Sequence, residues 1–389
     1  MPNEPGPMRP GRIVVLGVPG SRRVSSFVEE ASRLGIDRVD VVSYLDLIAG
    51  VAPVPGVGSL VRVESPSESA ETTRAILKAG IGPLEEVGGR PSSSAEIDRL
   101  DCGRGEIVAP RQWFFGFHEV LARLESAWSG DGSRWVSRPS TIATTFDKLA
   151  CLDLWRSAGL PTPGRHPDVQ SYAQLRDSIP GRHARVFVKL RYGYSAMGAV
   201  ALEWRDHLVR AITTTERVRA EGRDRLFVSK RPRVLTSEPE IAELIDALAV
   251  ESIVVEDWLP KARYDGVPYD VRVVMIGGRA RHLVGRASFS PFTNLNLDAR
   301  RISRESVEAH LGDAWGDFEA LCEGAASHLP EAGVLGLDVL IRPGRRRFAL
   351  LEANAFGDYL PRLTHAGQSV YEAELAHFGA LGTVAGALA

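Results

Sequence analysis

The apolar and polar positions near the start of the chain follow the pattern of a strand, a helix and a second strand. Residues 11–18, GRIVVLGV, form an apolar run that predicts a buried strand. Residues 25–35, SSFVEEASRLG, have the apolar spacing of a helix that ends at Gly35, and the next strand is predicted at 38–42. A strand, a helix and a strand at this spacing indicate a βαβ unit and therefore a parallel sheet.

The rest of this region is predicted to consist of loops around one long helix. Residues 51–62 and 80–105 are rich in glycine, serine and proline, which is typical of loops. Residues 113–128, WFFGFHEVLARLESAW, predict an amphipathic helix whose aromatic side chains mostly serve a core. The turn GVPGS after the first strand is either a phosphate site at a helix N-terminus or a plain turn that needs glycine. It lacks the full GxGxxG pattern, which favours the plain turn.

A second unit begins near Ser140. Residues 146–158, FDKLACLDLWRSA, have helical periodicity that stops at Gly159. The elements predicted next are strands at 184–190 and 198–204, helices at 207–220 and 238–249, strands at 252–259, 269–278 and 279–288, and one or two helices within 304–329. A final hairpin, 334–342 with 347–356, leads into a helix from about Ser369.

The composition is ordinary for a soluble globular protein. The 389 residues predict two or three domains, and 25% of them are charged while 44% are hydrophobic. A net charge of −2 does not indicate nucleic acid or an acidic membrane as a partner. The sequence contains no run of 18 or more apolar residues, so we expect no membrane span.

The cysteines and the N-terminus bear on the cellular setting. Cys102, Cys151 and Cys322 are odd in number and show neither CxxC nor metal-ligand spacing, which argues against a disulfide framework. The Pro- and Gly-rich N-terminus lacks the apolar core and cleavage site of a signal peptide. We therefore expect a cytoplasmic protein in which residues 1–10 form a flexible tail.

Basic side chains in apolar strands are the first candidates for chemistry. Lys189 lies near the end of the apolar strand VFVKL, and the glycine-containing segment RYGYSAMG follows it. A lysine there needs an anionic partner or a route to solvent, and glycine lets a backbone approach phosphate oxygens. Asp270 and Arg272 share one strand face, with Arg286 on the next strand. Two arginines over one sheet face suit phosphate or an acyl phosphate, although a same-face ion pair is the simpler alternative.

Acidic and amide side chains in the last hairpin predict a cation site. The turn PGRRR makes the strands with Asp338 and Glu352 antiparallel neighbours, and core alternation favours the register that brings Asp338, Glu352 and Asn354 together. Magnesium takes one or two carboxylates and completes its shell with water and phosphate oxygens. Without a cation, two adjacent carboxylates would repel each other. The alternative is a carboxylate pair neutralised by the nearby arginines.

Taken together, these segments resemble the ATP-grasp superfamily over roughly residues 139–367. FDKLACLDLWRSAGLPTP resembles the opening segment of that family, VFVKLRYGYSAMG its second-lysine strand and Gly-rich loop, and VVEDWLP the link between its two lobes. YDVRVVMIGGRARHLVGRAS resembles the "DxR … GG … R" strands, and GLDVLIR with LLEANAF the "D … ExN" metal hairpin. Five such segments in the family's order favour the resemblance, and the sub-type is most similar to ribosomal-protein-glutamate-ligase-like members.

The resemblance implies a role for each matching residue. The predicted nucleotide-binding residues are Lys148, Lys189, Tyr194, Ser195, Gly198, Glu256, Asp257 and Trp258. Arg272 and Arg286 would stabilise the transferred phosphoryl group, and Asn294 would lie at the catalytic edge near the acceptor. Asp338, Glu352 and Asn354 would hold magnesium. Asp358 and Tyr359, which follow this hairpin, either face the acceptor or shape the turn, and we favour the turn.

The activity that the resemblance implies is ATP-dependent ligation of a carboxylate to an amine through an acyl phosphate. ATP and one or two Mg²⁺ ions are the expected cofactors, with Mn²⁺ as a substitute. The expected partners are a carboxylate substrate and an amine acceptor, either of them a small molecule or a peptide, and a homodimer is open. A kinase acting on a hydroxyl and a non-catalytic nucleotide-binding module are the alternatives.

The predicted fold class is α/β, with an α+β C-terminal part. Residues 11–138 are predicted to form an N-terminal α/β domain with a parallel sheet, as in the domain that precedes an ATP-grasp module. Residues 139–389 are predicted to form the ATP-grasp module, with a small nucleotide-binding lobe at about 139–255 and a metal and catalytic lobe at about 256–389.

Overall fold

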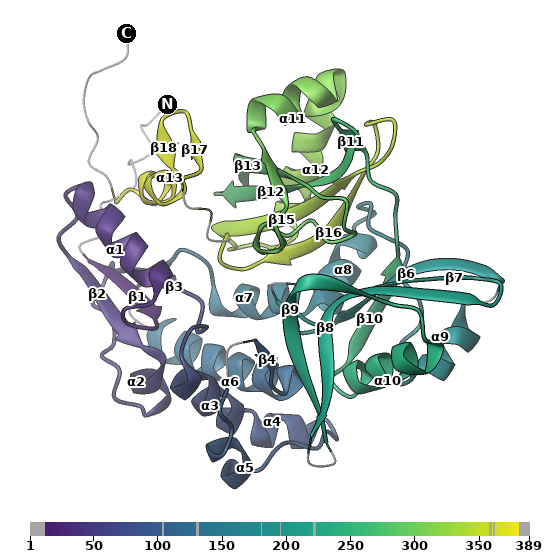
Figure 1. Cartoon of the computed structure of the whole chain (residues 1–389). Coiled ribbons are helices and arrows are strands. Elements are labelled where there is room, and N and C mark those ends of the chain that lie inside the picture. The colour runs from purple at the N-terminus through teal and green to yellow at the C-terminus, as the bar shows by residue number, and fades with distance from the viewer. Residues whose placement is uncertain are drawn as a thin grey trace.

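The computed structural model describes residues 12–102, 105–129, 132–179, 181–194, 196–220, 223–357, 360 and 362–380. The predicted tail at 1–10 and the predicted site residue Ser195 lie outside these ranges, as do Asp358 and Tyr359. Figure 1 shows a purple and blue N-terminal part, a teal part built on long strands, and a green part built on a second large sheet.

The N-terminal part is a parallel sheet with helices around it, as predicted. Its strand order is β2-β1-β3-β5, and β1 pairs in parallel with both β2 and β3. The elements are β1 (Ile13–Gly17), α1 (Arg22–Arg33), β2 (Val39–Ser43), α2 (Tyr44–Ile48), β3 (Leu60–Val63), α3 (Ala70–Ala79), α4 (Ile81–Glu86), α5 (Ser94–Asp98), α6 (Pro110–Trp128), β5 (Arg134–Trp135) and α7 (Pro139–Phe146).

The two segments predicted as loops in this part contain regular structure, so that prediction was wrong in part. Strand β3 falls at the end of 51–62, where only four residues, LVRV, are strand between two polar or glycine-rich segments. Helices α4 and α5 fall within 80–105. Helix α5 begins at a capping box in which the side chains of Ser93 and Glu96 each satisfy a backbone N–H of the other. Such caps stabilise a helix too short to show periodicity.

Helices α3 and α6 approach each other closely because glycines lie at their contact. A Cβ built on Gly116 would lie 1.8 Å from the carbonyl oxygen of Ile76, and one on Gly80 would lie 2.2 Å from the carbonyl oxygen of Gln112. Real side chains do not tolerate such distances to backbone atoms. The two helices can therefore keep this packing only with glycine at these positions.

We expect Gly116→Ala to destabilise the protein by about 1–3 kcal/mol, because overpacking a tight contact displaces backbone. The matched control is Gly82→Ala in the neighbouring helix α4, where a Cβ would meet no atom within 4 Å. Alanine there should be neutral or stabilising by about 0.5–1 kcal/mol, since glycine loses more backbone entropy on folding. Urea denaturation of the two variants measures both effects, and equal stabilities would contradict the close contact.

The teal part is an antiparallel sheet of order β10-β6-β7-β8-β9-β4 with two helices beside it. We refer to it as the small lobe. Its elements are β4 (Glu106–Ile107), α9 (Tyr172–Ser178), β6 (His183–Leu190), β7 (Val200–Arg205), β8 (Leu208–Ala220), β9 (Arg223–Leu235), α10 (Glu238–Ala249) and β10 (Ile253–Asp257).

The predicted helix at 207–220 is wrong, because this segment is the long strand β8. Val209, Ala211 and Thr213 are buried, while Leu208 before them and Arg210 between Val209 and Ala211 are exposed, which is a period of two. Thr213 begins a run of three consecutive threonines, and β-branched residues favour strands over helices. Strand β8 forms a hairpin with β9, and the many charged residues of β9 give no clear strand pattern from which this pairing could be predicted.

The green part, which we call the large lobe, is built on the sheet order β14-β13-β12-β15-β16, with β11 also beside β12. Its elements are β11 (Arg263–Tyr264), β12 (Val267–Ile276), β13 (Arg279–Ala287), η2 (Leu295–Leu297), β14 (Arg300–Ile302), α11 (Arg304–Leu311), η3 (Gly312–Ala314), α12 (Trp315–Ser327), β15 (Val334–Ile341) and β16 (Phe348–Asn354). Helix α8 (Lys148–Ser157), blue in Figure 1, packs into the core of this lobe and is counted with it.

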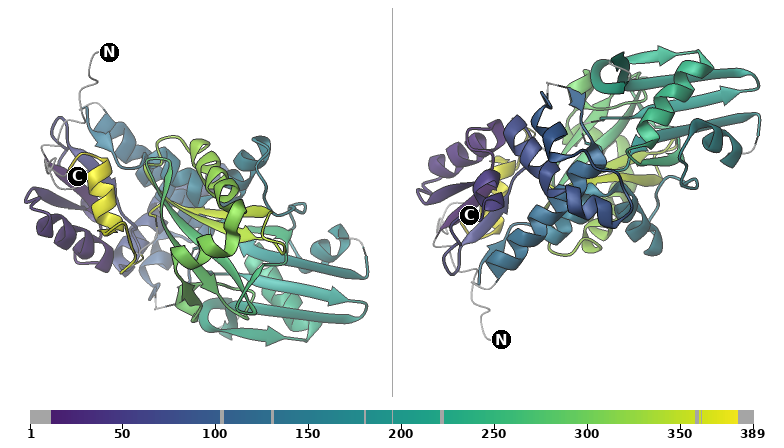
Figure 2. Two further views of the ribbon diagram at one scale, coloured as in Figure 1. Left: turned by 90° about the horizontal axis from the view of Figure 1, so that it is seen from above. Right: turned by 90° about the horizontal axis from the view of Figure 1, so that it is seen from below.

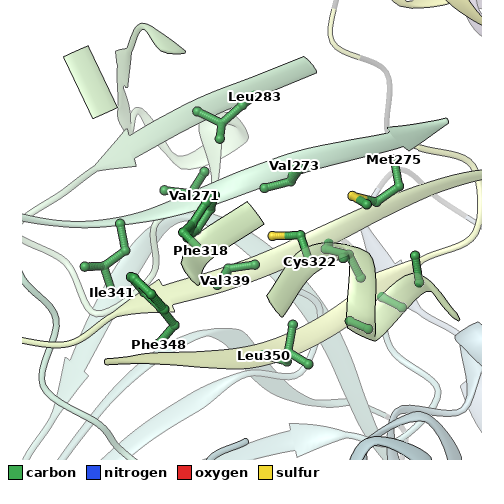
Figure 3. Packing of buried hydrophobic residues seen from close by; sticks show 14 of the residues in the cluster. Val271, Val273, Met275, Leu283, Phe318, Cys322, Val339, Ile341, Phe348 and Leu350 are labelled. Carbon is green, nitrogen blue, oxygen red and sulfur yellow. The ribbon is translucent and has the colours of Figure 1, made fainter. Parts of the chain in front are cut away.

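One face of the large-lobe sheet forms the main hydrophobic core. Val271, Val273 and Leu350 pack with Phe318 and Cys322 of α12 (Figure 3). Because successive side chains of a strand point to opposite faces, the residues between these core positions lie on the other face of the sheet. That face carries the charged residues described below.

The C-terminal segment returns to the N-terminal part. It consists of β17 (Thr364–His365), β18 (Gln368–Ser369) and α13 (Val370–His377), and α13 lies beside α1 in both views of Figure 2. Glu372 of α13 pairs with Arg33 of α1 at 3.2 Å. Among the described residues, no helix has both the length and the apolar character needed to cross a membrane.

Candidate active site

A cavity of about 640 Å³ brings together residues from the N-terminal part, the small lobe and the large lobe. Most of the predicted site residues line it, namely Lys148, Lys189, Tyr194, Glu256, Asp257, Arg272, Arg286, Asn294, Asp338, Glu352 and Asn354. These residues lie up to about two hundred positions apart in the sequence, and the sheet pairings described next bring them together.

The large-lobe sheet contributes a cluster of four buried charged side chains. Asp270 and Arg272 of β12 lie opposite Arg286 of β13 and Asp338 of β15, respectively. Arg286 Nε donates to Asp270 Oδ1 at 2.8 Å, and Arg286 Nη2 lies 3.0 Å from Asp338 Oδ2. Arg272 donates to the same carboxylate through Nε and, at 3.1 Å, through Nη2. Asp338 therefore lies between two guanidinium groups.

These contacts fix the ionisation of the cluster. Burial alone would raise the pKa of Asp338, but Arg272 and Arg286 outweigh it and hold that pKa well below its ordinary value. Asp270 behaves in the same way, since Arg286 and Lys261 overcome the effect of burial and lower its pKa. At neutral pH the two carboxylates are ionised and the cluster is a fixed array of alternating charges.

Glu352 differs from Asp338 because it is only loosely paired. It lies opposite Asp338 in the β15–β16 ladder, as the predicted register requires. Its side chain is 26% exposed, with Oε2 3.6 Å from Lys148 Nζ and Oε1 4.0 Å from Arg272 Nη2. A bulge beside Asp338 shifts the register, so that Leu351 and Glu352 both line the cavity while Leu350 stays in the core.

The three predicted metal ligands fit magnesium unequally. Glu352 offers a carboxylate to the cavity, and Asn354 lines the same wall with an amide nitrogen that is buried without a hydrogen-bond partner in the described structure. Asp338 is already engaged by two arginines. Within the described residues, no group of three or more His, Cys, Asp or Glu side chains is placed to hold a metal. Magnesium here would rely on Glu352, the Asn354 amide oxygen and phosphate oxygens, and the metal site remains a prediction.

Lys148 lies at the start of α8. The predicted helix at 146–158 is helix α8, which begins two residues later than predicted. Phe146 ends α7, and Asp147 caps α8 by accepting from the backbone N–H groups of Leu149 and Ala150. Arg191, just after β6, holds the Asp147 carboxylate at 2.5 Å. This arrangement directs Lys148 Nζ to the carbonyl oxygen of Gly193 at the entrance to the Gly-rich loop.

Lys189 and Glu256 form a buried pair across neighbouring strands of the small lobe. Lys189 Nζ donates to Glu256 Oε2 at 2.8 Å, and Glu256 is 1% exposed. Burial alone would lower the pKa of Lys189, but Glu256 and the more distant Glu352 raise it above its ordinary value. Lys189 is therefore a cation. Glu256 is the anionic partner that a lysine in an apolar strand was predicted to need.

The Gly-rich loop between β6 and β7 is held by threonines that the sequence did not single out. Thr214 Oγ1 donates to the carbonyl oxygen of Ala196 at 2.5 Å, and Thr213 Oγ1 donates to that of Ala199 at 3.0 Å. Tyr194 lines the cavity, whereas Gly198 does not and instead takes a left-handed backbone, with φ +64°, that lets the chain pass close to Leu190.

The segment between the lobes also divides into cavity and packing residues. Glu256 and Asp257 line the cavity, and Asp257 Oδ1 lies 2.9 Å from His166 Nε2. The ring of Trp258 packs on Phe187 at 5.4 Å and beneath the Arg185 guanidinium at 4.0 Å. Trp258 is not among the described residues that line the cavity. Its side chain instead packs against Phe187, which does line it.

Other lining residues were missed by the sequence interpretation. Lys261 Nζ donates to Asp270 Oδ2 at 3.0 Å and to Thr293 Oγ1 at 2.8 Å, and burial lowers the pKa of Lys261. It thus ties the segment before Asn294 to the charged cluster. Arg22 and Arg23 of α1 also line the cavity. Their signal in the sequence was GVPGSRR, two arginines directly after the first strand-to-helix turn.

Comparisons with known proteins identify the fold. No protein-family model and no curated protein sequence matches the chain. The ATP-grasp ligase PsnB, complexed with a phosphomimetic variant of a minimal precursor, Mg and ADP, aligns over 94% of this chain and 98% of that chain, with 16% identity and a TM-score of 0.52. PsnB with precursor peptide PsnA2 and AMPPNP aligns over 95% and 98%, with 16% identity and a TM-score of 0.50. The macrocyclase MdnB from Microcystis aeruginosa MRC aligns over 95% and 100%, with 15% identity and a TM-score of 0.49.

The chain therefore has the ATP-grasp fold, and the predicted fold class is confirmed. Nearly the whole of this chain and of PsnB align, so the match includes the N-terminal part as well as the two lobes. At 16% identity the likeness establishes the architecture, while substrates must be argued from the side chains of this cavity.

Proposed function

We propose that this protein is an ATP- and Mg²⁺-dependent ligase that activates a carboxylate as an acyl phosphate for attack by an amine. The observation that carries the proposal is the cavity of an ATP-grasp fold, which is lined by Lys148, Lys189, Arg272 and Arg286 together with the loosely paired carboxylate of Glu352. PsnB is an ATP-grasp ligase whose structures contain a precursor peptide with AMPPNP, or a variant of a minimal precursor with Mg and ADP. This supports ATP and Mg²⁺ as ligands of the cavity and allows a peptide or a small molecule as the substrate.

The reaction would depend on charge and position. Lys148 and Lys189 lie beside the Gly-rich loop and would bind ATP phosphates, with the segment at Glu256 and Asp257 near the base. Bound Mg²⁺, held by Glu352 and Asn354, would neutralise charge on the phosphate oxygens. Arg272 and Arg286 would stabilise the phosphoryl group during transfer to the substrate carboxylate. The amine then attacks the acyl carbon, phosphate leaves, and the amide forms with loss of a proton.

The proposal also includes the acceptor-side role of Asn294 and a cytoplasmic location. Asn294, in the segment that Lys261 and Thr293 tie to Asp270, would lie beside the acceptor amine.

The three cysteines are all unpaired thiols, which supports the reducing cytoplasm expected from the sequence.

Hydroxylamine provides a test that does not require the natural acceptor. It attacks acyl phosphates to give hydroxamates, which are detected as coloured iron(III) complexes. We expect the protein, incubated with ATP, Mg²⁺ and a panel of carboxylic acids, to release ADP and form a hydroxamate with at least one acid. A stable phosphorylated product without hydroxamate would instead indicate a kinase, and nucleotide binding without turnover across the panel would indicate a binding module.

Lys148→Met should weaken binding of AMPPNP by about 10- to 100-fold. A charge-assisted hydrogen bond contributes about 1.5–3 kcal/mol, and every 1.4 kcal/mol is a tenfold change in affinity. The matched control is Lys230→Met, at an exposed lysine of β9 in the small lobe that does not line the cavity, for which we expect no change. Isothermal titration calorimetry with Mg²⁺ measures both, and equal affinities for the two variants would remove Lys148 from the nucleotide site.

A further inference from the structure

The cavity has a wall that the proposed chemistry does not use. It is formed by the N-terminal part of the chain, where Arg22 and Arg23 in the first turn of α1 and Ser67 and Glu68 before α3 line the same cavity as Lys148 and Arg286. A substrate that reaches from the phosphoryl-transfer site to α1 would meet these side chains.

Arg23 is held by a chain of buried charges. Its Nη1 lies 3.6 Å from Oε1 of Glu64, which is fully buried. The other oxygen of Glu64 lies 2.6 Å from Nη1 of Arg62, and Arg62 Nε donates to Glu374 of α13 at 2.7 Å. Arg62 also lies over the ring of Phe27, at 4.6 Å from its centroid. The series Glu374, Arg62, Glu64, Arg23 thus runs from the C-terminal helix to the cavity.

Stability alone does not account for this series. Taking charges out of water is costly, and well-packed apolar residues of similar volume are often as stabilising as a buried ion pair or more so. Arg62, Glu64 and Glu374 are each at most 3% exposed and belong to two segments far apart in the sequence. What the series does provide is a fixed position for the Arg23 side chain, which is 19% exposed and lines the cavity.

The charge at this end of the cavity is positive. Arg22 and Arg23 line it, and Glu68 is the one acidic side chain among the described lining residues from the N-terminal part. Glu68 accepts from the backbone N–H of Arg22 at 3.3 Å and pairs with the Arg22 guanidinium at 3.6 Å, while Arg23 is held by the buried Glu64. An anionic group placed near Arg23 would be bound by a guanidinium that is already oriented.

We infer that the substrate carries a second anionic group, a carboxylate remote from the reacting carbonyl, which Arg23 binds at the α1 wall of the cavity. This inference rests on the proposed ligase function and adds the substrate class to it. The carboxylate belongs either to the activated acid, which is then a dicarboxylate, or to the amine acceptor, which is then of the amino-acid type. Glu64 and Arg62 act as positioning residues for Arg23.

Matched substrates test the inference. The wild-type protein is assayed with dicarboxylic acids and their monoamides, using hydroxylamine as the nucleophile, and then with amino acids and their amides as acceptors. We expect one of the two sets to show at least a tenfold preference, in kcat/KM, for the member with the extra carboxylate. The set that shows it identifies which substrate carries the group, and the absence of a preference in both sets would overturn the inference while leaving the ligase function intact.

Variants then assign the preference to Arg23. Arg23→Gln should bring the preference close to one, and Arg23→Lys should restore part of it, whereas Arg33→Gln at the far end of α1 should leave it unchanged. A retained preference in Arg23→Gln would overturn the assignment. Glu64→Gln, where thermal denaturation shows it folded, should raise KM for the carboxylate-bearing substrate more than it lowers kcat.

A binding measurement separates this inference from the ligase function. With AMPPNP and Mg²⁺ bound, the preferred carboxylate should raise the melting temperature of the wild-type protein more than its amide does, and Arg23→Gln should abolish that difference. If the wild-type protein forms no hydroxamate and no amide but shows this shift, the anion site stands and the ligase function falls. If the wild-type protein turns over but shows no such shift in melting temperature, the ligase function stands and the anion site falls.

Discussion

Glu352→Gln should reduce ATP turnover by at least about a hundredfold while leaving the melting temperature within a few degrees of the wild-type value. The loss follows because the carboxylate offered to the cavity is the one expected to hold the cation, and removing one such electrostatic contribution to a transition state costs about 10²–10³ in kcat. The fold should persist because the ion pairs of Glu352, at 3.6 and 4.0 Å, are long and partly exposed.

The control for this variant is Glu331→Gln. Glu331 pairs with Arg138 outside the cavity and is more exposed than Glu352, so its neutral variant should keep full turnover. Turnover is followed as ADP release at saturating ATP and Mg²⁺, and stability by differential scanning calorimetry. Full activity in Glu352→Gln would remove Glu352 from the metal site.

Arg286→Met should abolish turnover and also destabilise the protein by about 3–5 kcal/mol. Arg286 is buried between Asp270 and Asp338, at 2.8 and 3.0 Å from their oxygens. Its removal leaves the buried Asp270 without its main partner and Asp338 with only the guanidinium of Arg272. Both variants should lose turnover, but only Arg286→Met should also lose stability. The pair thus distinguishes Glu352, which acts in the reaction, from Arg286, which also stabilises the fold.

A second arginine on the same strand provides the matched control for Arg286. Arg279 of β13 pairs with Glu323 at 2.7 Å, but its side chain is 68% exposed, so Arg279→Met should change the free energy of unfolding by less than about 1 kcal/mol. Urea denaturation at pH 7 measures both variants. Equal stabilities would show that the charged cluster contributes little to the fold.

Much of the large lobe could be predicted because alternation and register are local properties. The period-two pattern put Asp270 and Arg272 on one face, and the short turn between β15 and β16 put Asp338 opposite Glu352. These pairings needed no knowledge of distant parts of the chain. The ATP-grasp resemblance followed from the same segments in order, and the fold confirms it.

The errors arose where tertiary contacts decide the local structure. The segment 207–220, predicted as a helix, is a strand because it pairs with β7 and β9. The short β3 and α5 carry too few residues to show a period. In each case the signal lay in a partner strand or a cap, which a count of apolar positions does not detect.

The contribution of the N-terminal part to the cavity was beyond sequence reasoning for a different reason. Arg23 and Arg286 lie far apart in the chain, and Arg23 reaches the cavity wall because α1 packs with α13 and with strands of the large lobe in one hydrophobic cluster. The engagement of Asp338 by both arginines was likewise weighed as an alternative in the sequence and becomes visible only in the geometry.

Transfer of oxygen from the substrate tests the central claim most directly. A carboxylic acid that supports turnover is labelled with ¹⁸O in its carboxylate and incubated with the protein, ATP, Mg²⁺ and an amine or hydroxylamine. Activation as an acyl phosphate predicts that one ¹⁸O atom per turnover appears in the released inorganic phosphate, observed as an upfield shift in the ³¹P NMR signal. Unlabelled phosphate accompanied by amide formation would contradict the acyl-phosphate mechanism, and a labelled carboxylate recovered intact beside a phosphorylated hydroxyl would contradict the ligase assignment.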